Sequence, residues 1–93
     1  MIVLDTNIIS EIVRSTPDAR VLAWLDAQPA SSLFTTAISQ AEILYGLALL
    51  PIGRRRDDLK RAIVPIFDQD LAGRILSFDS DAASSYSQIV IAR

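Results

Sequence analysis

The side chains of this sequence that could perform chemistry are oxygen donors. Its 93 residues include 11 Asp and Glu residues but no His and no Cys. This composition excludes Ser-His-Asp and Cys-His catalytic units, thiolate nucleophiles and the usual zinc sites. A metal bound by this chain would therefore be a hard cation such as Mg²⁺ or Mn²⁺, held by carboxylates, carbonyls and water.

Asp5 is the first acidic residue whose position suggests a functional role. It follows the apolar run at residues 2–4, which reads as a short buried strand, and it precedes a helical pattern that begins at Thr6 or Asn7. Its carboxylate would lie at the carboxyl end of a parallel strand, where α/β proteins bind their ligands. The same position suits an Asx turn or a helix N-cap that only joins strand to helix. Both interpretations remain open from the position alone.

Glu42 is the second such residue, because it lies on an apolar stripe of a predicted helix. The other members of the stripe are Ile38, Ala41, Tyr45 and Leu49. We expect this stripe to pack inward, and a lone buried carboxylate is costly unless it is paired or bound to a metal. No Lys or Arg lies within one helical turn of Glu42, although Arg74 could pair with it from elsewhere in the fold.

Together, Asp5 and Glu42 are predicted to converge on one Mg²⁺ or Mn²⁺ ion, whose charge would offset the cost of burying the carboxylates. Such an ion lowers the pKa of bound water and stabilises the negative charge that develops on a phosphodiester, which is the chemistry of metal-dependent nucleases. Two carboxylates form a sparse site, and the sequence offers no obvious third.

The elements that must position these acids follow the pattern of an α/β protein. Short β-like segments alternate with longer helical ones, which favours a short parallel sheet flanked by helices. The expected strands are residues 2–4, 32–34 and 75–78. The expected helices are residues 7–14, 18–27, 37–50 and 54–71, the last kinked or split by Pro65, and a final helix from about residue 79 to 93. No linker interrupts the pattern, so residues 1–93 are expected to form a single domain.

Composition favours a soluble, cytoplasmic protein. Hydrophobic residues make up 51% of the chain and charged residues 22%, and the N-terminal apolar run is too short for a signal peptide or a membrane span. The absence of Cys agrees with a reducing compartment.

One local basic cluster stands out in a chain with a net charge of −2. Arg54, Arg55 and Arg56 could contact RNA phosphates. Asp57 and Asp58 follow at once, however, so the cluster also fits a solvated helix face with paired charges.

Three segments taken together resemble a known family: "MIVLDTNIISEI", "AISQAEILYGLALLPIGRRRDDL" and "GRILSFDSDAASSYSQI". The chain resembles the PIN-domain VapC toxins of bacterial type II toxin–antitoxin pairs, especially their FitB-like branch, over essentially its whole length. The resemblance implies a compact α/β domain, Mg²⁺- or Mn²⁺-dependent endoribonuclease activity, a homodimer, and inhibition by a small cognate antitoxin. It places Asp5 and Glu42 at the first two acidic positions of the family's metal site. Thr6 and Asn7 fall beside the first acid, where they would order the strand-to-helix turn and the water on the metal.

Family members are longer than this chain, and their additional part carries a third acid on a helix, then a strand followed by an Asn and a further acid. We therefore expect residues 1–93 to be the N-terminal two-thirds of the family domain, without its C-terminal strands. Asp79 and Asp81 occur too early to be the missing ligands. The alternative function is that of a catalytically inactive remnant that dimerises or binds an antitoxin, in which Trp24 and Leu25 would matter more than Asp5.

Overall fold

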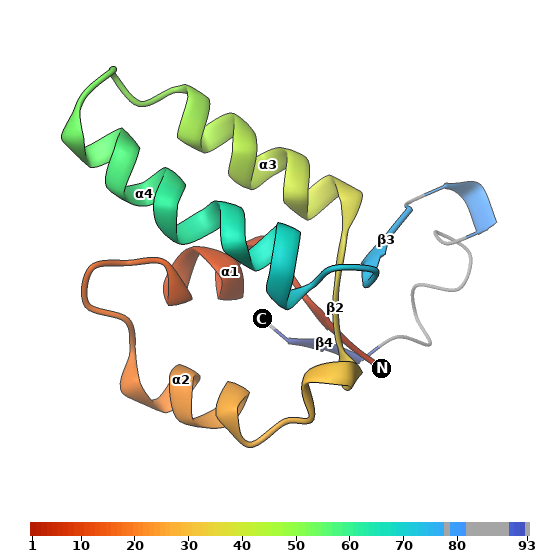
Figure 1. The fold of residues 1–93 in the computed structure, drawn as a ribbon. Helices are drawn as coiled ribbons and strands as arrows, with labels where there is room; N and C mark the ends of the chain where they lie inside the picture. Colours follow the sequence, from red (N-terminus) through yellow and green to blue (C-terminus); the bar gives the residue numbers. More distant parts are fainter. Residues whose placement is uncertain (78, 82–89, 93) are drawn as a thin grey trace.

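A parallel β-sheet organises the computed structural model of the chain, which describes residues 1–77, 79–81 and 90–92 (Figure 1). Its strands are β1 (Ile2–Leu4), β2 (Leu33–Thr36), β3 (Ile75–Leu76) and β4 (Val90–Ala92), in the order β3-β2-β1-β4. β1 is a central strand, with Ile2 opposite Leu33 of β2 on one side and opposite Val90 of β4 on the other. The predicted α/β class with a short parallel sheet flanked by helices is confirmed.

Two strands differ from the predicted ones in their bounds. β2 begins at Leu33 and continues to Thr36, two residues beyond the predicted end. β3 covers only Ile75–Leu76 of the predicted segment 75–78, whose last residue lies outside the described part of the chain.

The predicted helix up to residue 93 is wrong at residues 90–92, which form β4. Helical structure does begin at Ser80 and Asp81, but residues 82–89 and 93 lie outside the described structure. A short apolar run is compatible with either a helix or a strand. The β-branched side chains of Val90 and Ile91 favour a strand, and pairing with β1 supplies their backbone with hydrogen-bond partners.

The helices agree closely with the predicted ranges. They are α1 (Thr6–Ile12), α2 (Ala19–Asp26), α3 (Ala37–Ala48) and α4 (Arg54–Pro65). Pro65 ends α4 as predicted, and the chain continues in a wider π-helical turn, Ile66–Asp70. None of these helices is long and apolar enough to cross a membrane.

Side-chain caps start three of the helices and explain their positions. Asp5 caps α1, Asp18 caps α2 and Thr36 caps α3, each by accepting a hydrogen bond from a backbone N–H in the first turn. The side chain of Arg20 and then its backbone N–H lower the pKa of the half-buried Asp18 carboxyl, so this cap stays ionised.

The core lies between the sheet and helices α1, α3 and α4. Its buried side chains are Leu4, Ile8, Ile9, Ile43, Leu47, Ile63 and Phe67. α1 packs against both α2 and α3, and α3 packs against α4 (Figure 1). The core thus fixes the start of α1 relative to the start of α3.

α3 presents the opposite face to the core from the one predicted. Its buried residues are Ser39, Ile43 and Leu47, whereas the predicted inward stripe is exposed, with Tyr45 and Leu49 each 66% exposed. The helix carries apolar residues on both faces, so spacing alone does not identify the buried one. At the start of the buried face, the Ser39 N–H donates to the Thr36 hydroxyl at 3.1 Å, so this backbone donor is satisfied although it is buried.

Candidate metal centre

Asp5 lies where β1 ends and α1 begins, as predicted. Its backbone is extended (φ −85°, ψ 176°), and its Oδ1 accepts a hydrogen bond from the Ile8 N–H at 3.2 Å. The N-cap interpretation is therefore correct for this oxygen. Within the described part of the chain, Oδ2 accepts no hydrogen bond, so the cap leaves one carboxylate oxygen for another ligand.

Glu42 reaches the same region from α3, although its surroundings differ from the predicted ones. The residue is exposed rather than buried, and its Oε2 accepts a hydrogen bond from the Thr6 hydroxyl at 2.8 Å. The suggested pairing with Arg74 is wrong, because Arg74 donates instead to the backbone carbonyls of Leu33 and Asp70. Glu42 is thus held by a neutral hydroxyl and keeps its second oxygen free of any hydrogen bond in the described structure.

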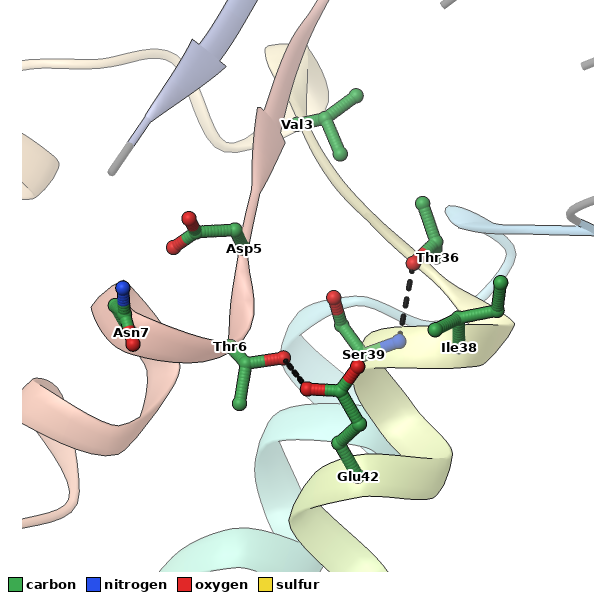
Figure 2. A pocket seen from close by; sticks show the side chains of 8 residues that line it. All are labelled: Val3, Asp5, Thr6, Asn7, Thr36, Ile38, Ser39 and Glu42. Carbon is green, nitrogen blue, oxygen red and sulfur yellow. Dashed lines mark hydrogen bonds between the residues drawn. The ribbon is translucent and has the colours of Figure 1, made fainter. Parts of the chain in front are cut away.

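A pocket of about 480 Å³ joins these residues (Figure 2). It is lined by Val3, Asp5, Thr6, Asn7, Thr36, Ile38, Ser39 and Glu42. β1 and β2 are adjacent and parallel, so their carboxyl ends open onto the same edge of the sheet. In Figure 2 the Asp5 carboxylate lies on the side of Asn7 and is turned away from Glu42, whose carboxylate is directed toward Thr6 and Ser39. The structure therefore brings Asp5, Glu42, Thr6 and Asn7 to one pocket.

The donors of this pocket fit a hard cation. Two acidic residues, three residues with hydroxyl groups and one Asn line it, and no Lys or Arg of the described residues does. Mg²⁺ accepts one or two protein carboxylates and completes its shell with water. Among the residues that the structure describes, no group of three acidic, His or Cys side chains could hold a metal, so Asp5 and Glu42 are the two acidic residues of this pocket.

Two hydroxyl groups of the pocket were not predicted from the sequence. Thr36 and Ser39 are each only 8% exposed, and both line the pocket beside Glu42. The spacing could have indicated Ser39, because it precedes Glu42 by three residues and residues at this spacing are neighbours on a helix surface.

Two of the three arginines proposed to contact RNA lie near this pocket but do not line it. Arg54 and Arg55 line a neighbouring groove of about 1080 Å³ between α1, α3 and α4. Thr6 and Glu42 line both the groove and the pocket, so the two spaces adjoin. Arg56 is half-buried and does not belong to the lining of the groove.

Comparison with known proteins gives one consistent set of relatives. The family model of the PIN domain matches residues 2–93. The chain is 47% identical over 90 residues to the VapC ribonuclease Y4jK of Sinorhizobium fredii, and 44% identical over 93 residues to the toxin FitB of Neisseria gonorrhoeae. These matches cover 97% and 96% of this chain, and the chain spans 64% of the length of each relative.

A solved structure shares the fold as well. The structure of FitAB bound to the IR36 DNA fragment contains a chain that is 44% identical to this one and superposes on it with a TM-score of 0.79. The match covers 95% of this chain and 62% of that chain. Sequence and fold similarity therefore extend across the whole pocket.

Proposed function

Because the chain belongs to the PIN-domain family, we propose that it acts as a metal-dependent endoribonuclease, the toxin of a type II toxin–antitoxin pair of the VapC type. One observation carries the proposal. Asp5 and Glu42, from elements far apart in the sequence, line one pocket at the carboxyl edge of a parallel sheet, and among the residues that the structure describes no Lys or Arg lines this pocket. Relatives that are named as a ribonuclease and as a toxin support the reaction and its biological role.

Asp5 and Glu42 would hold the ion, which is Mg²⁺ or Mn²⁺ in our proposal. When bound, such an ion supplies a Lewis acid for the phosphodiester and lowers the pKa of water. The backbone N–H of Ile8 fixes one Asp5 oxygen, and the Thr6 hydroxyl fixes one Glu42 oxygen. Each carboxylate is thereby oriented before the substrate arrives, and Asn7 adds a neutral polar group at the wall of the pocket.

Metal dependence is the direct test. We expect the purified protein to cut a structured RNA in the presence of Mn²⁺ or Mg²⁺ and to lose all cutting when the ion is removed with EDTA, because the proposed residues include no His or Lys that could replace the ion. Gel analysis of a labelled RNA measures the cutting, and titration calorimetry with Mn²⁺ alone measures binding of the ion. Undiminished cutting in EDTA would contradict the mechanism.

We further propose that the arginine cluster at residues 54–56 contacts RNA phosphates. Replacing all three arginines by Gln should weaken RNA binding and flatten its dependence on salt. The logarithm of the binding constant changes by about 0.7 per tenfold change in salt for each phosphate contact to a single strand, so the slope should fall by about 2 for three contacts. Fluorescence anisotropy over a range of NaCl concentrations measures the slope. Arg20→Gln is the control, since Arg20 lies on α2 and does not line the groove. An unchanged slope in the triple variant would remove these arginines from the RNA site.

Two protein partners belong to the same proposal: a small cognate antitoxin and a second copy of the chain. The similar solved structure contains FitA with FitB, which supports an antitoxin.

The alternative function, binding without catalysis, is favoured by α2, where Leu22 is 38% and Trp24 is 40% exposed, whereas Leu25 packs against the core. The alternative would be favoured if the protein binds an antitoxin but cleaves no RNA with either Mn²⁺ or Mg²⁺.

A further inference from the structure

The first turn of α3 forms one wall of the pocket that contains Asp5 and Glu42. The N-cap of this helix, Thr36, and two residues of its first turn, Ile38 and Ser39, line the pocket. The N–H groups of a first helical turn have no acceptor inside the helix, and they carry a positive partial charge. The pocket therefore lies at the positive end of the α3 dipole, and nothing in the mechanism above uses this charge.

The cap of α3 is neutral, unlike the caps of α1 and α2. Those two helices begin at the carboxylates of Asp5 and Asp18, and α4 has Asp57 in its first turn. α3 begins at the hydroxyl of Thr36 and has no acidic residue in its first turn. Among α1, α2, α3 and α4, only α3 has neither an acidic cap nor an acidic residue in the first turn, so the partial charge at its start is available to another anion.

The Ser39 side chain is a buried donor at the same place. Ser39 is only 8% exposed, and its hydroxyl makes no hydrogen bond with any residue that the structure describes, because the contact with Thr36 uses the Ser39 backbone N–H. In the described part of the chain, every fully enclosed side-chain oxygen or nitrogen has a hydrogen-bond partner, so the Ser39 oxygen is open to the pocket. In Figure 2 this hydroxyl points from α3 into the space bordered by Asp5 and Thr36. Buried hydroxyl groups usually have a partner, so Ser39 indicates a position for a ligand atom.

We propose that the Ser39 hydroxyl and the Ile38 N–H bind a non-bridging oxygen of the phosphodiester that is cut, so that Ser39 is a substrate-binding residue. The proposal rests on the proposed nuclease function. A phosphate oxygen is a strong acceptor for hydroxyl groups and for the N–H groups of a helix start. Glu42 follows Ser39 by three residues on α3, so a phosphate here would lie next to an acid that is proposed to hold the ion. Because Asp5 and Glu42 are acidic, we expect an anion to bind only weakly until a cation balances them.

Ser39→Ala removes the hydroxyl and leaves the cap of α3 intact, since the cap uses the backbone N–H of Ser39. We expect the dissociation constant for a short, fluorescein-labelled RNA to rise about tenfold, the usual factor for the loss of one hydrogen bond to a charged group. Anisotropy in an Asp5→Asn background, which slows cutting, measures this constant. Ser31→Ala is the matched control, because Ser31 is exposed and does not line the pocket. Circular dichroism checks that both variants are folded.

Ile38→Glu and Ile38→Gln form a second pair of variants, since Ile38 is 46% exposed and lines the pocket. The two new side chains have nearly the same shape, but only the carboxylate of Ile38→Glu would repel a phosphate at the start of α3. RNA should bind to Ile38→Glu about tenfold or more weakly than to Ile38→Gln. Calorimetry with Mn²⁺ alone should show undiminished ion binding in Ile38→Glu, because an added carboxylate does not repel a cation. Weaker RNA binding would then not result from loss of the ion.

Inorganic phosphate gives a measurement that depends on no substitution. With Mg²⁺ present, it should shift the amide NMR signals of Ile38 and Ser39 more than that of Val21 in the first turn of α2. Equal RNA affinities of Ser39→Ala and Ser31→Ala, with RNA cutting intact, would overturn the phosphate site but not the nuclease. Phosphate shifts at α3 in a protein that neither binds nor cuts RNA would overturn the nuclease and assign the site to a free phosphate. Absence of both the shifts and the cutting would overturn both proposals.

Discussion

Replacement of Asp5 by Asn should lower RNA cleavage by about 100-fold or more while the domain stays folded. Asn is as good an N-cap as Asp, so its side-chain oxygen can still accept the hydrogen bond from the Ile8 N–H. The substitution removes only the negative charge, and with it the attraction for a divalent ion. Single-turnover cleavage at saturating Mn²⁺ gives the rate, and calorimetry gives the weaker binding of Mn²⁺.

Asp18→Asn is the control for Asp5→Asn, because Asp18 caps α2 in the same way but lies outside the metal pocket. This variant should cleave RNA at the original rate. Loss of cleavage in both variants would point to a general effect of removing a capping charge. Full cleavage in Asp5→Asn would defeat the assignment of Asp5 as a metal ligand.

Replacement of Ile9 by Ala should lower the free energy of unfolding by about 2–5 kcal/mol, the usual range for truncating a buried aliphatic side chain to Ala. Ile9 is 0% exposed and packs in the core at the base of α1. A domain of 93 residues has little stability to spare, so this loss could unfold a large fraction of the molecules at 37 °C. Urea unfolding followed by circular dichroism measures the change.

The same truncation at Ile52 provides the comparison, since Ile52 is 92% exposed. Ile52→Ala should change the free energy of unfolding by less than about 0.5 kcal/mol. Similar losses at both positions would mean that α1 does not pack on the sheet as described.

The strand-to-helix turn at Asp5 was predictable because every signal for it is local. An apolar run, an acidic residue and a helical pattern follow one another within a few residues, and each favours the same geometry. The helix ranges were predictable for the same reason. Pro65 ends α4 because proline has no backbone N–H and its ring clashes with the preceding turn.

The surroundings of Glu42 were not predictable, because they depend on contacts between distant segments. The hydrogen bond from Thr6 to Glu42 joins residues 36 positions apart, and periodicity carries no information about such a pair. The predicted burial of Glu42 was wrong, because α3 carries apolar residues on two faces and buries the face without Glu42. The resemblance places Glu42 at an acidic position of the family's metal site without any reference to burial, and that role stays a prediction.

β4 was not predicted from the sequence, because it too depends on contact with a distant segment. Val90–Ala92 is too short for its period to be read, and its partner, β1, lies at the other end of the chain. The pairing with β1 adds to the weak preference of the β-branched residues for a strand, since it satisfies backbone groups that a helix would have satisfied internally.

The hydrogen bond between Asp5 and the first turn of α1 links ion binding to the local opening of a helix. α1 has only seven residues, and helices of this length depend on their caps and on packing for stability. An ion on the second Asp5 oxygen would bind the conformation in which the Asp5 carboxylate caps α1. By mass action, the ion would therefore stabilise the first turn of the helix. The amide hydrogens of this turn would exchange with solvent more slowly when the ion is bound. A substitution that makes the start of α1 more flexible would therefore weaken the affinity of the protein for the ion.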